Sequence, residues 1–363
     1  MSALDFTQTS TTRRVGEDER AQILADPGFG SHFTDFMARA RWTLEDGWGG
    51  AEVVPFGPIQ LSPGSAVLHY GQEIFEGLKA FRHADGSVWT FRPQANAERL
   101  QRSARRLALP ELPIEDFLAS LRAVVAADEP WVPEATSEES LYLRPFMFAG
   151  EEFLGVRAAH SVDYYVIASP AGPYFPRGVQ PLVVWISDDY SRAGAGGTGA
   201  AKCGGNYASS LLGKREAAEQ GADEVLFLDS ETRSSIDELS GMNVFALTRD
   251  GRLLTPALTG SILEGVTRSS ILTLAAERGL QVEETHLLIS EVLEQLSSGE
   301  IVEMFACGTA AVINPIGEFR ARGGTWTVGD GGSGETTLSL RQELTDIQYG
   351  RIPDRHGWLT RLV

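Results

Sequence analysis

The sequence predicts a mixed α/β (α+β) protein of two domains, and three observations lead to this expectation. Short strand-like runs alternate with helical patterns along most of the chain, which is typical of proteins that combine sheets with helices. The 363 residues exceed the usual size of one domain, and the 42% that are hydrophobic can form a large core. Residues 171–178 are dense in glycine and proline, as interdomain linkers often are.

These observations divide the chain into four predicted parts. They are a polar N-terminal extension (1–28), a small N-terminal α/β domain (29–170), an interdomain linker (171–180) and a large C-terminal domain (181–363). Within the extension, residues 1–20 are expected to be loose.

Apolar spacing and turn residues predict the elements of the N-terminal domain. Residues 29–41 mix aromatic and polar side chains and give no clear pattern. Residues 51–67 read as two short strands broken by Pro58 and Pro63. The other expected elements are paired strands over 74–81 and 88–91, helices over 96–107 and 114–127, and strands over 141–148 and 162–168.

The C-terminal domain shows the same alternation and no internal repeat. Its expected strands cover 181–186, 224–229, 243–248, 252–255 and 301–305. Its expected helices cover 207–220, 267–278, 290–296 and 338–348.

Composition excludes several classes of function. A formal net charge of −18 disfavours nucleic acid and anionic lipid as partners, since both are bound through clustered Lys and Arg. The only cysteines, Cys203 and Cys307, form no disulfide framework and lack zinc-ligand spacing. No secretory signal or membrane-spanning run is visible. We therefore expect a cytoplasmic protein that acts on small molecules and binds no metal.

A glycine-rich segment, Gly194–Gly199, formally matches the dinucleotide fingerprint G-x-G-x-x-G. The match lacks its context, because seven residues separate it from the preceding strand and no helical pattern starts at Gly199. Lys202, which follows, has only small or apolar neighbours. Burial among them would favour a neutral, nucleophilic amine, as Schiff-base chemistry requires. A solvated lysine in a flexible loop is an equal alternative from these residues alone.

Seven segments, in this order along the chain, carry a resemblance to a known family. They are His69–Phe81 (HYGQEIFEGLKAF), Phe91–Arg99 (FRPQANAER), Leu141–Pro145 (LYLRP), Lys202–Tyr207 (KCGGNY), Asp237–Asn243 (DELSGMN), Gly260–Arg268 (GSILEGVTR) and Cys307–Ala310 (CGTA). Together they resemble the branched-chain aminotransferases, which are fold-type IV enzymes dependent on pyridoxal 5′-phosphate. The resemblance runs from about Phe29 to the C-terminus and implies a smaller N-terminal lobe and a larger pseudo-barrel lobe.

The resemblance implies roles for four residues at the cofactor. Lys202 would form the Schiff base and move a proton between the substrate Cα and the cofactor C4′. Tyr207 would donate to the phenolic oxygen, and Glu238 would pair with the ring nitrogen. Arg99 would hold the phosphate. From the residues alone, Asp237 competes with Glu238, and Arg99 cannot be told apart from Arg102, Arg105 and Arg106.

The phosphate would also meet a helix start. A helix N-terminus offers unpaired N–H groups and a favourable dipole to an anion. The resemblance places Gly265, Val266 and Thr267 there, with Thr309 as a second hydroxyl. Without the resemblance, these residues read equally well as ordinary turn and capping residues.

A substrate pocket is implied for branched apolar side chains and for the distal carboxylate of glutamate. Tyr142 and Arg144 would bind that carboxylate, and Tyr70 would line the pocket. The apolar wall would come from Phe29, Phe75 and Val156, and the α-carboxylate would meet the N–H of Ala310. Gly241 stands where the mammalian enzymes carry a threonine. Ala311 and Asn314 stand where those enzymes carry a Cys-x-x-Cys pair, so we expect no thiol switch.

The expected reaction is transamination of L-leucine, L-isoleucine and L-valine with 2-oxoglutarate by a homodimer. Two alternatives remain within fold type IV, a D-amino-acid transaminase and an aminodeoxychorismate lyase. Those chains are usually shorter and lack the roughly fifty-residue N-terminal extension that this chain has. A cofactor-binding protein without turnover is the alternative from another class.

Overall fold

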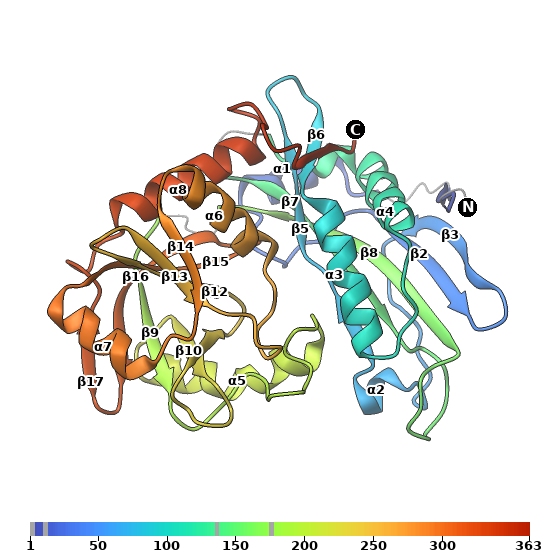
Figure 1. The fold of residues 1–363 in the computed structure, drawn as a ribbon. Helices are drawn as coiled ribbons and strands as arrows, with labels where there is room; N and C mark the ends of the chain where they lie inside the picture. The colour runs from blue at the N-terminus through green and yellow to red at the C-terminus, as the bar shows by residue number, and fades with distance from the viewer. Residues whose placement is uncertain (1–3, 10–13, 135–137, 174–177) are drawn as a thin grey trace. The chain divides into compact units, whose positions relative to one another are not determined.

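The computed structural model describes residues 4–9, 14–134, 138–173 and 178–363, and the chain divides into two units (Figure 1). The first unit comprises Met1–Pro176, Ala201–Gly204 and Asp346–Val363, and the second comprises Arg177–Ala200 and Gly205–Thr345. The predicted linker 171–180 and extension 1–28 fall partly outside the described residues, at 174–177, 1–3 and 10–13. The four-part division therefore stays a prediction.

The described part of the first unit holds a nine-stranded sheet in the order β1-β3-β2-β8-β7-β5-β6-β18, with β4 also paired to β7. Neighbouring strands are antiparallel except for β1 and β3. The strands are β1 (Thr7–Gln8), β2 (Phe36–Thr43), β3 (Gly47–Pro55), β4 (Glu73–Phe75), β5 (Leu78–Arg82), β6 (Val88–Phe91), β7 (Ser140–Phe148), β8 (Ser161–Ala171) and β18 (Leu359–Arg361).

Helices cover one face of this sheet (Figure 1). α4 packs on β2 and β8 because Phe117, Leu121, Val124 and Val125 form one buried apolar stripe. On β7, buried Leu141 and Leu143 alternate with half-buried Tyr142 and Arg144, so the latter pair projects from the opposite face. The helices are α1 (Glu17–Ala25), α2 (Val67–Tyr70), α3 (Pro93–Arg106), α4 (Ile114–Ala127) and the 3₁₀ turn η1 (Glu129–Trp131).

The second unit contains another nine-stranded sheet within the described residues, in the order β11-β10-β9-β16-β15-β12-β13-β14, with β17 paired to β16. Parallel pairs, such as β9 with β10, occur beside antiparallel ones, such as β12 with β15. The strands are β9 (Leu182–Ser187), β10 (Glu224–Leu228), β11 (Ile236–Leu239), β12 (Asn243–Thr248), β13 (Arg252–Pro256), β14 (Gln281–Thr285), β15 (Ile301–Gly308), β16 (Val312–Ala321) and β17 (Gly324–Thr327).

Four helices accompany this second sheet. α5 packs closely on β10, since a Cβ at Gly213 would lie 3.0 Å from the Phe227 ring. α6 packs on β14 and β15, and α7 packs on β15 and β17. The helices are α5 (Gly204–Glu219), α6 (Val266–Glu277), α7 (Ile289–Ser298) and α8 (Glu335–Gln348). The predicted mixed α/β class is confirmed.

Some local predictions are wrong. Residues 17–20, expected to be loose, begin α1, and the second strand expected within 51–67 is absent from these described residues. The strand expected over 74–81 is interrupted at Glu76 and Gly77. The register on both sides places Glu76 opposite Pro145. Glu76 N–H donates to Pro145 O at 2.7 Å, but proline has no N–H to donate back, so the ladder is broken there.

Candidate active site

The segment that carries Lys202 is anchored within the first unit. Lys202 N–H donates to Ser103 Oγ at 2.9 Å, and Lys202 C=O accepts from Phe75 N–H at 2.9 Å. Its neighbours Ala201 and Cys203 belong to the buried core, and its Nζ lies 4.8 Å from the centre of the Phe75 ring. Lys202 is half-buried on a fixed backbone, unlike a lysine in a flexible loop.

Arg99 is distinguished from its neighbours by burial. Its side chain is 4% exposed, whereas Arg102, Arg105 and Arg106 lie on the exposed part of α3. Arg99 Nε and Nη2 donate to the two carboxylate oxygens of Glu76, each at 2.8 Å. Sequence reasoning missed Glu76, although an acidic residue in the middle of a mostly apolar strand run was a visible signal.

Four predicted substrate residues gather beside the first sheet. Arg144 Nη2 donates to Tyr142 Oη at 3.1 Å, and its guanidinium lies 4.8 Å from the centre of the Phe75 ring. Phe29 meets Tyr142 edge-on, with ring centres 5.1 Å apart. Gly77 leaves room for the phenol, since a Cβ there would collide with Tyr142 Oη. This cluster offers a cation and a hydroxyl beside apolar rings.

Tyr70 and Val156 lie elsewhere in the first unit. Their exposed fractions are 42% and 87%, and Tyr70 Oη donates to Leu154 O. In the isolated chain, they do not join the cluster around Arg144.

Glu238 is the anionic centre of the second unit. It is 2% exposed and forms an ion pair with Arg192, whose Nη1 lies 2.9 Å from Oε1. Leu263 N–H donates to Oε1 at 2.8 Å, and Asn243 Nδ2 donates to Oε2 at 3.1 Å. These donors stabilise the carboxylate form. Sequence reasoning missed Arg192 and Asn243, and nothing in their local pattern marks them.

Asp237, the alternative to Glu238, lies in a different environment. Strand alternation directs it away from Glu238, and Ser261 Oγ donates to its Oδ1 at 3.2 Å. Burial raises the pKa of Asp237, although Ser261 partly opposes the shift. Glu238 is therefore the better charged partner for a protonated ring nitrogen.

The start of α6 lies next to Glu238. α6 begins at Val266 and is preceded by Gly265. No side-chain hydrogen bond caps this end of the helix. A Cβ at Gly265 would collide with Asn243 Oδ1, and Asn243 also donates to Glu238. A helix start without a side-chain cap suits a phosphate. Thr267, in the first turn, is buried.

Tyr207 and the turn after β15 are neighbours of Gly241. A Cβ at Gly241 would lie 3.7 Å from the Tyr207 ring, and one at Gly308 would lie 3.5 Å from Gly241 O. Thr309 and Ala310 follow Gly308 and are half-buried. The second unit thus brings a phenol, a carboxylate, a helix start without a side-chain cap and the turn after β15 into one connected region. These groups fit an aromatic cofactor with a basic ring nitrogen and a phosphate.

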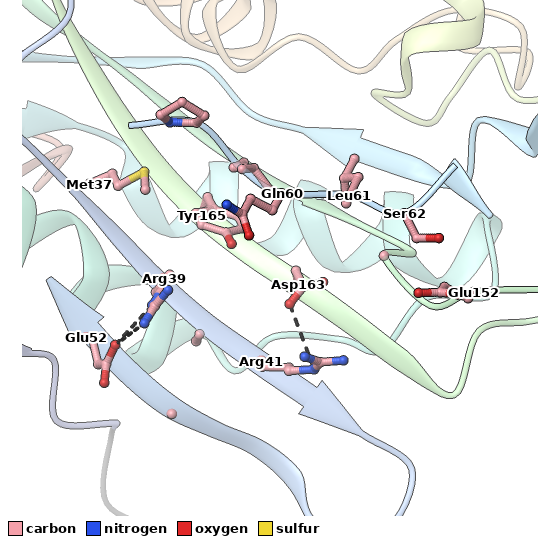
Figure 2. A pocket seen from close by; sticks show the side chains of 15 residues that line it. Met37, Arg39, Arg41, Glu52, Gln60, Leu61, Ser62, Glu152, Asp163 and Tyr165 are labelled. Atoms are coloured by element: carbon pink, nitrogen blue, oxygen red, sulfur yellow. Dashed lines mark hydrogen bonds and ion pairs between the residues drawn. The ribbon is translucent and has the colours of Figure 1, made fainter. Parts of the chain in front are cut away.

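Other parts of the described chain fit a ligand less well. No group of three His, Cys, Asp or Glu side chains in these ranges could hold a metal ion, and no described helix is long and apolar enough to cross a membrane. A cavity of about 680 Å³ lies in the first unit, beside β2 and β8 (Figure 2). It contains none of the predicted site residues, and ion pairs already join Arg39 to Glu52 and Arg41 to Asp163 there.

Comparison with known proteins gives a consistent result. The family model for amino-transferase class IV matches residues 73–319. The chain is 53% identical to a branched-chain-amino-acid aminotransferase of Mycolicibacterium smegmatis, over 99% of this chain and 98% of that one. It is 51% identical to the enzyme of that name from Mycobacterium tuberculosis, over 99% of both chains.

Solved structures agree. The Escherichia coli branched-chain amino acid aminotransferase aligns with a TM-score of 0.71 and 32% identity, covering 90% of this chain and 99% of that one. The T.th. branched-chain amino acid aminotransferase with pyridoxamine 5′-phosphate aligns with a TM-score of 0.74 and 30% identity, with the same coverage. From its motifs, its fold and these relatives, the chain belongs to the class IV aminotransferases, within the branched-chain-amino-acid aminotransferase family.

Proposed function

We propose that this protein transfers the amino group of L-leucine, L-isoleucine or L-valine to 2-oxoglutarate, using pyridoxal 5′-phosphate. The observation that carries the proposal is the Arg144–Tyr142 pair beside Phe75. Such a cluster offers a charged partner to a distal carboxylate and apolar surface to a branched side chain. One methylene in an apolar pocket is worth only about 1–3 kcal/mol, so one enzyme can serve all three amino acids.

The cofactor, when bound, supplies an aldehyde carbon and an electron-accepting ring. Lys202 would hold the aldehyde carbon through its amine and would move the Cα proton as a base. Its anchored backbone keeps the amine within a narrow range of positions. Glu238 keeps a negative charge at the ring nitrogen, and Arg192 with Asn243 keeps that carboxylate in place. Tyr207 donates to the phenolic oxygen.

Phosphate binding falls to Arg99, the start of α6 at Gly265, Val266 and Thr267, and the hydroxyl of Thr309. The α6 N-terminus contributes N–H groups and its dipole. Ala310 N–H meets the substrate α-carboxylate, beside Gly241. Phe29 and Phe75 form the apolar wall, as the edge contact of Phe29 with Tyr142 supports.

We further propose a homodimer in the cytoplasm. Tyr70 and Val156 are too exposed to line a pocket in one chain, and exposed Leu68 and Leu154 accompany them on the same unit. A second copy covering this region would bury them and allow the pocket role expected for Tyr70 and Val156. The two cysteines are free and buried, which suits a reducing compartment. Light scattering should give twice the chain mass, and Val156→Asp should shift it toward a monomer.

The decisive experiment combines a spectrum with an assay. Protein loaded with pyridoxal phosphate should show an absorbance band at roughly 410 nm, as expected for a lysine-bound cofactor. It should lose the band on addition of L-leucine and form glutamate when 2-oxoglutarate follows. Lys202→Ala should lack the band. If D-alanine or aminodeoxychorismate reacts and L-leucine does not, the proposal is wrong. High identity to branched-chain enzymes over nearly the whole chain disfavours that outcome.

A further inference from the structure

One buried carboxylate in the first unit has no role in the reaction as described above. Glu76 is 0% exposed and lies in the interruption between β4 and β5. The Glu76 carboxylate accepts hydrogen bonds from Arg99 Nε and Nη2 and also from Asn96 Nδ2, the last at 2.8 Å. Gly77 N–H donates to the same oxygen at 3.3 Å. Three side-chain donors and one backbone donor thus converge on a carboxylate that water does not reach.

The side-chain donors to Glu76 lie on α3, the helix that also binds the segment carrying Lys202. Asn96, Arg99 and Ser103 lie on one buried face of α3. Ser103 Oγ accepts a hydrogen bond from Lys202 N–H. Phe75, next to Glu76 in the sequence, donates its N–H to Lys202 C=O. Glu76 therefore lies where the phosphate-binding arginine and the reactive lysine are both attached to the fold.

The electrostatics are consistent with a permanent charge on Glu76. Burial alone would raise the pKa of Glu76, but the Arg99 guanidinium, with help from Lys202 and Asn96, holds it below its usual value. A buried ion pair is a costly way to stabilise a fold, since apolar residues of similar volume often do as well or better. Two parallel N–H···O bonds do, however, fix the plane of a guanidinium. The pair therefore suits a role in orientation better than a role in stability.

We propose that Glu76 is a positioning residue for the cofactor phosphate, acting through Arg99. Its two bonds to Nε and Nη2 set the orientation in which the Arg99 guanidinium meets the phosphate. The inference rests on the proposed function, in which Arg99 binds that group. It concerns affinity for the phosphate, and it assigns Glu76 no contact with substrate or with the reacting atoms.

The test measures cofactor affinity in Glu76→Gln, which keeps the shape of the side chain and removes its charge. Dissociation constants for pyridoxal phosphate and for pyridoxal, which lacks the phosphate, are measured on apoenzyme by tryptophan fluorescence. We expect the affinity for pyridoxal phosphate to fall at least about tenfold, because the charge-assisted hydrogen bonds that hold the Arg99 guanidinium are weakened. The affinity for pyridoxal should change less than about twofold. Glu98→Gln, on the exposed face of α3, is the matched control and should change neither.

A double-mutant cycle separates positioning from a general effect on the fold. If Glu76 acts through Arg99, the variant Glu76→Gln/Arg99→Gln should bind pyridoxal phosphate as weakly as Arg99→Gln alone. Additive losses, or equal losses for pyridoxal and its phosphate, would overturn the proposal. Thermal melting of each apoenzyme shows which variants are folded under the assay conditions. If the unmodified protein bound no pyridoxal phosphate, the proposed function itself would fail, a result distinct from any of these.

Discussion

Arg192 and Glu238 form an ion pair that is almost completely removed from solvent, with side chains 1% and 3% exposed. Arg192 Nη1 also lies 3.1 Å from Ser261 O and 3.3 Å from Gly199 O. The guanidinium therefore joins the anionic centre to the glycine-rich segment before Lys202.

Replacing Arg192 should leave an uncompensated buried charge. We expect Arg192→Met to lower the free energy of unfolding of the apoenzyme by about 3 kcal/mol, measured by urea denaturation. Arg192→Met/Glu238→Gln should recover part of this loss, because the unpaired carboxylate is gone. The exposed Arg215, whose side chain is 72% exposed, serves as the control, and Arg215→Met should have almost no effect. A double variant less stable than Arg192→Met would contradict this account.

Tyr142→Phe tests the proposal that Tyr142 and Arg144 bind the distal carboxylate of 2-oxoglutarate. The change removes the hydroxyl that accepts from Arg144 and keeps the apolar ring against Phe29. We expect the KM for 2-oxoglutarate to rise about tenfold, since one hydrogen bond to a charged group is lost. The KM for L-leucine should change less than about threefold. Steady-state kinetics with both substrates provide the measurement, and equal changes in the two KM values would remove Tyr142 from carboxylate recognition.

Gly199 has a packing role that its sequence pattern does not reveal. A Cβ at this position would collide with the backbone of Ser261, which cannot move aside as a flexible side chain could. We expect Gly199→Ala to cost about 1–3 kcal/mol of unfolding free energy, the usual range for overpacking. Gly205 has open space around it, so Gly205→Ala should cost nothing measurable. Similar melting temperatures for both variants would show that the backbone near Ser261 can adapt.

Asp128 should make stability depend on pH in an unusual direction. Burial raises the pKa of Asp128 from 3.8 to about 7, although Phe36 N–H donates to its Oδ2. Because the folded state binds this proton more tightly than the unfolded state, the contribution of Asp128 to the unfolding free energy falls as pH rises from about 4 to 7.

The variant Asp128→Asn has no such proton to lose. Its stability relative to the unmodified protein should therefore increase between pH 4 and 7 and stay constant above that. Each pKa unit corresponds to about 1.4 kcal/mol, so a gain on the order of a few kcal/mol is expected at neutral pH. Urea denaturation of both proteins at several pH values tests this. A difference that is independent of pH would mean that folding leaves the pKa of Asp128 unchanged.

Many helices and strands could be predicted from the sequence, whereas the contacts between polar side chains that are far apart in it could not. The helix expected over 114–127 and the strand over 243–248 have the predicted bounds. The helix has a regularly repeating apolar face, and the strand is a short run that is buried throughout. The resemblance supplied Lys202, Arg99 and Glu238 as candidates. It did not supply the side chains that hold them, Glu76, Arg192 and Asn243. Each of these is distant in sequence from its partner or lies in an ordinary local pattern, so only the folded chain brings them together.

Ala201–Gly204 and Asp346–Val363 belong to the first unit, although the second unit separates them from it in the sequence. This limits how the enzyme can be divided into fragments. β18, near the end of the chain, pairs with β6, and Leu362 belongs to the core of the first unit. A fragment ending near residue 176 would therefore lack an edge strand, part of its core and Lys202. A fragment starting near residue 177 would carry those pieces without the sheet they complete. Splitting this chain or exchanging its units should accordingly fail unless Met1–Pro176, Ala201–Gly204 and Asp346–Val363 are moved together.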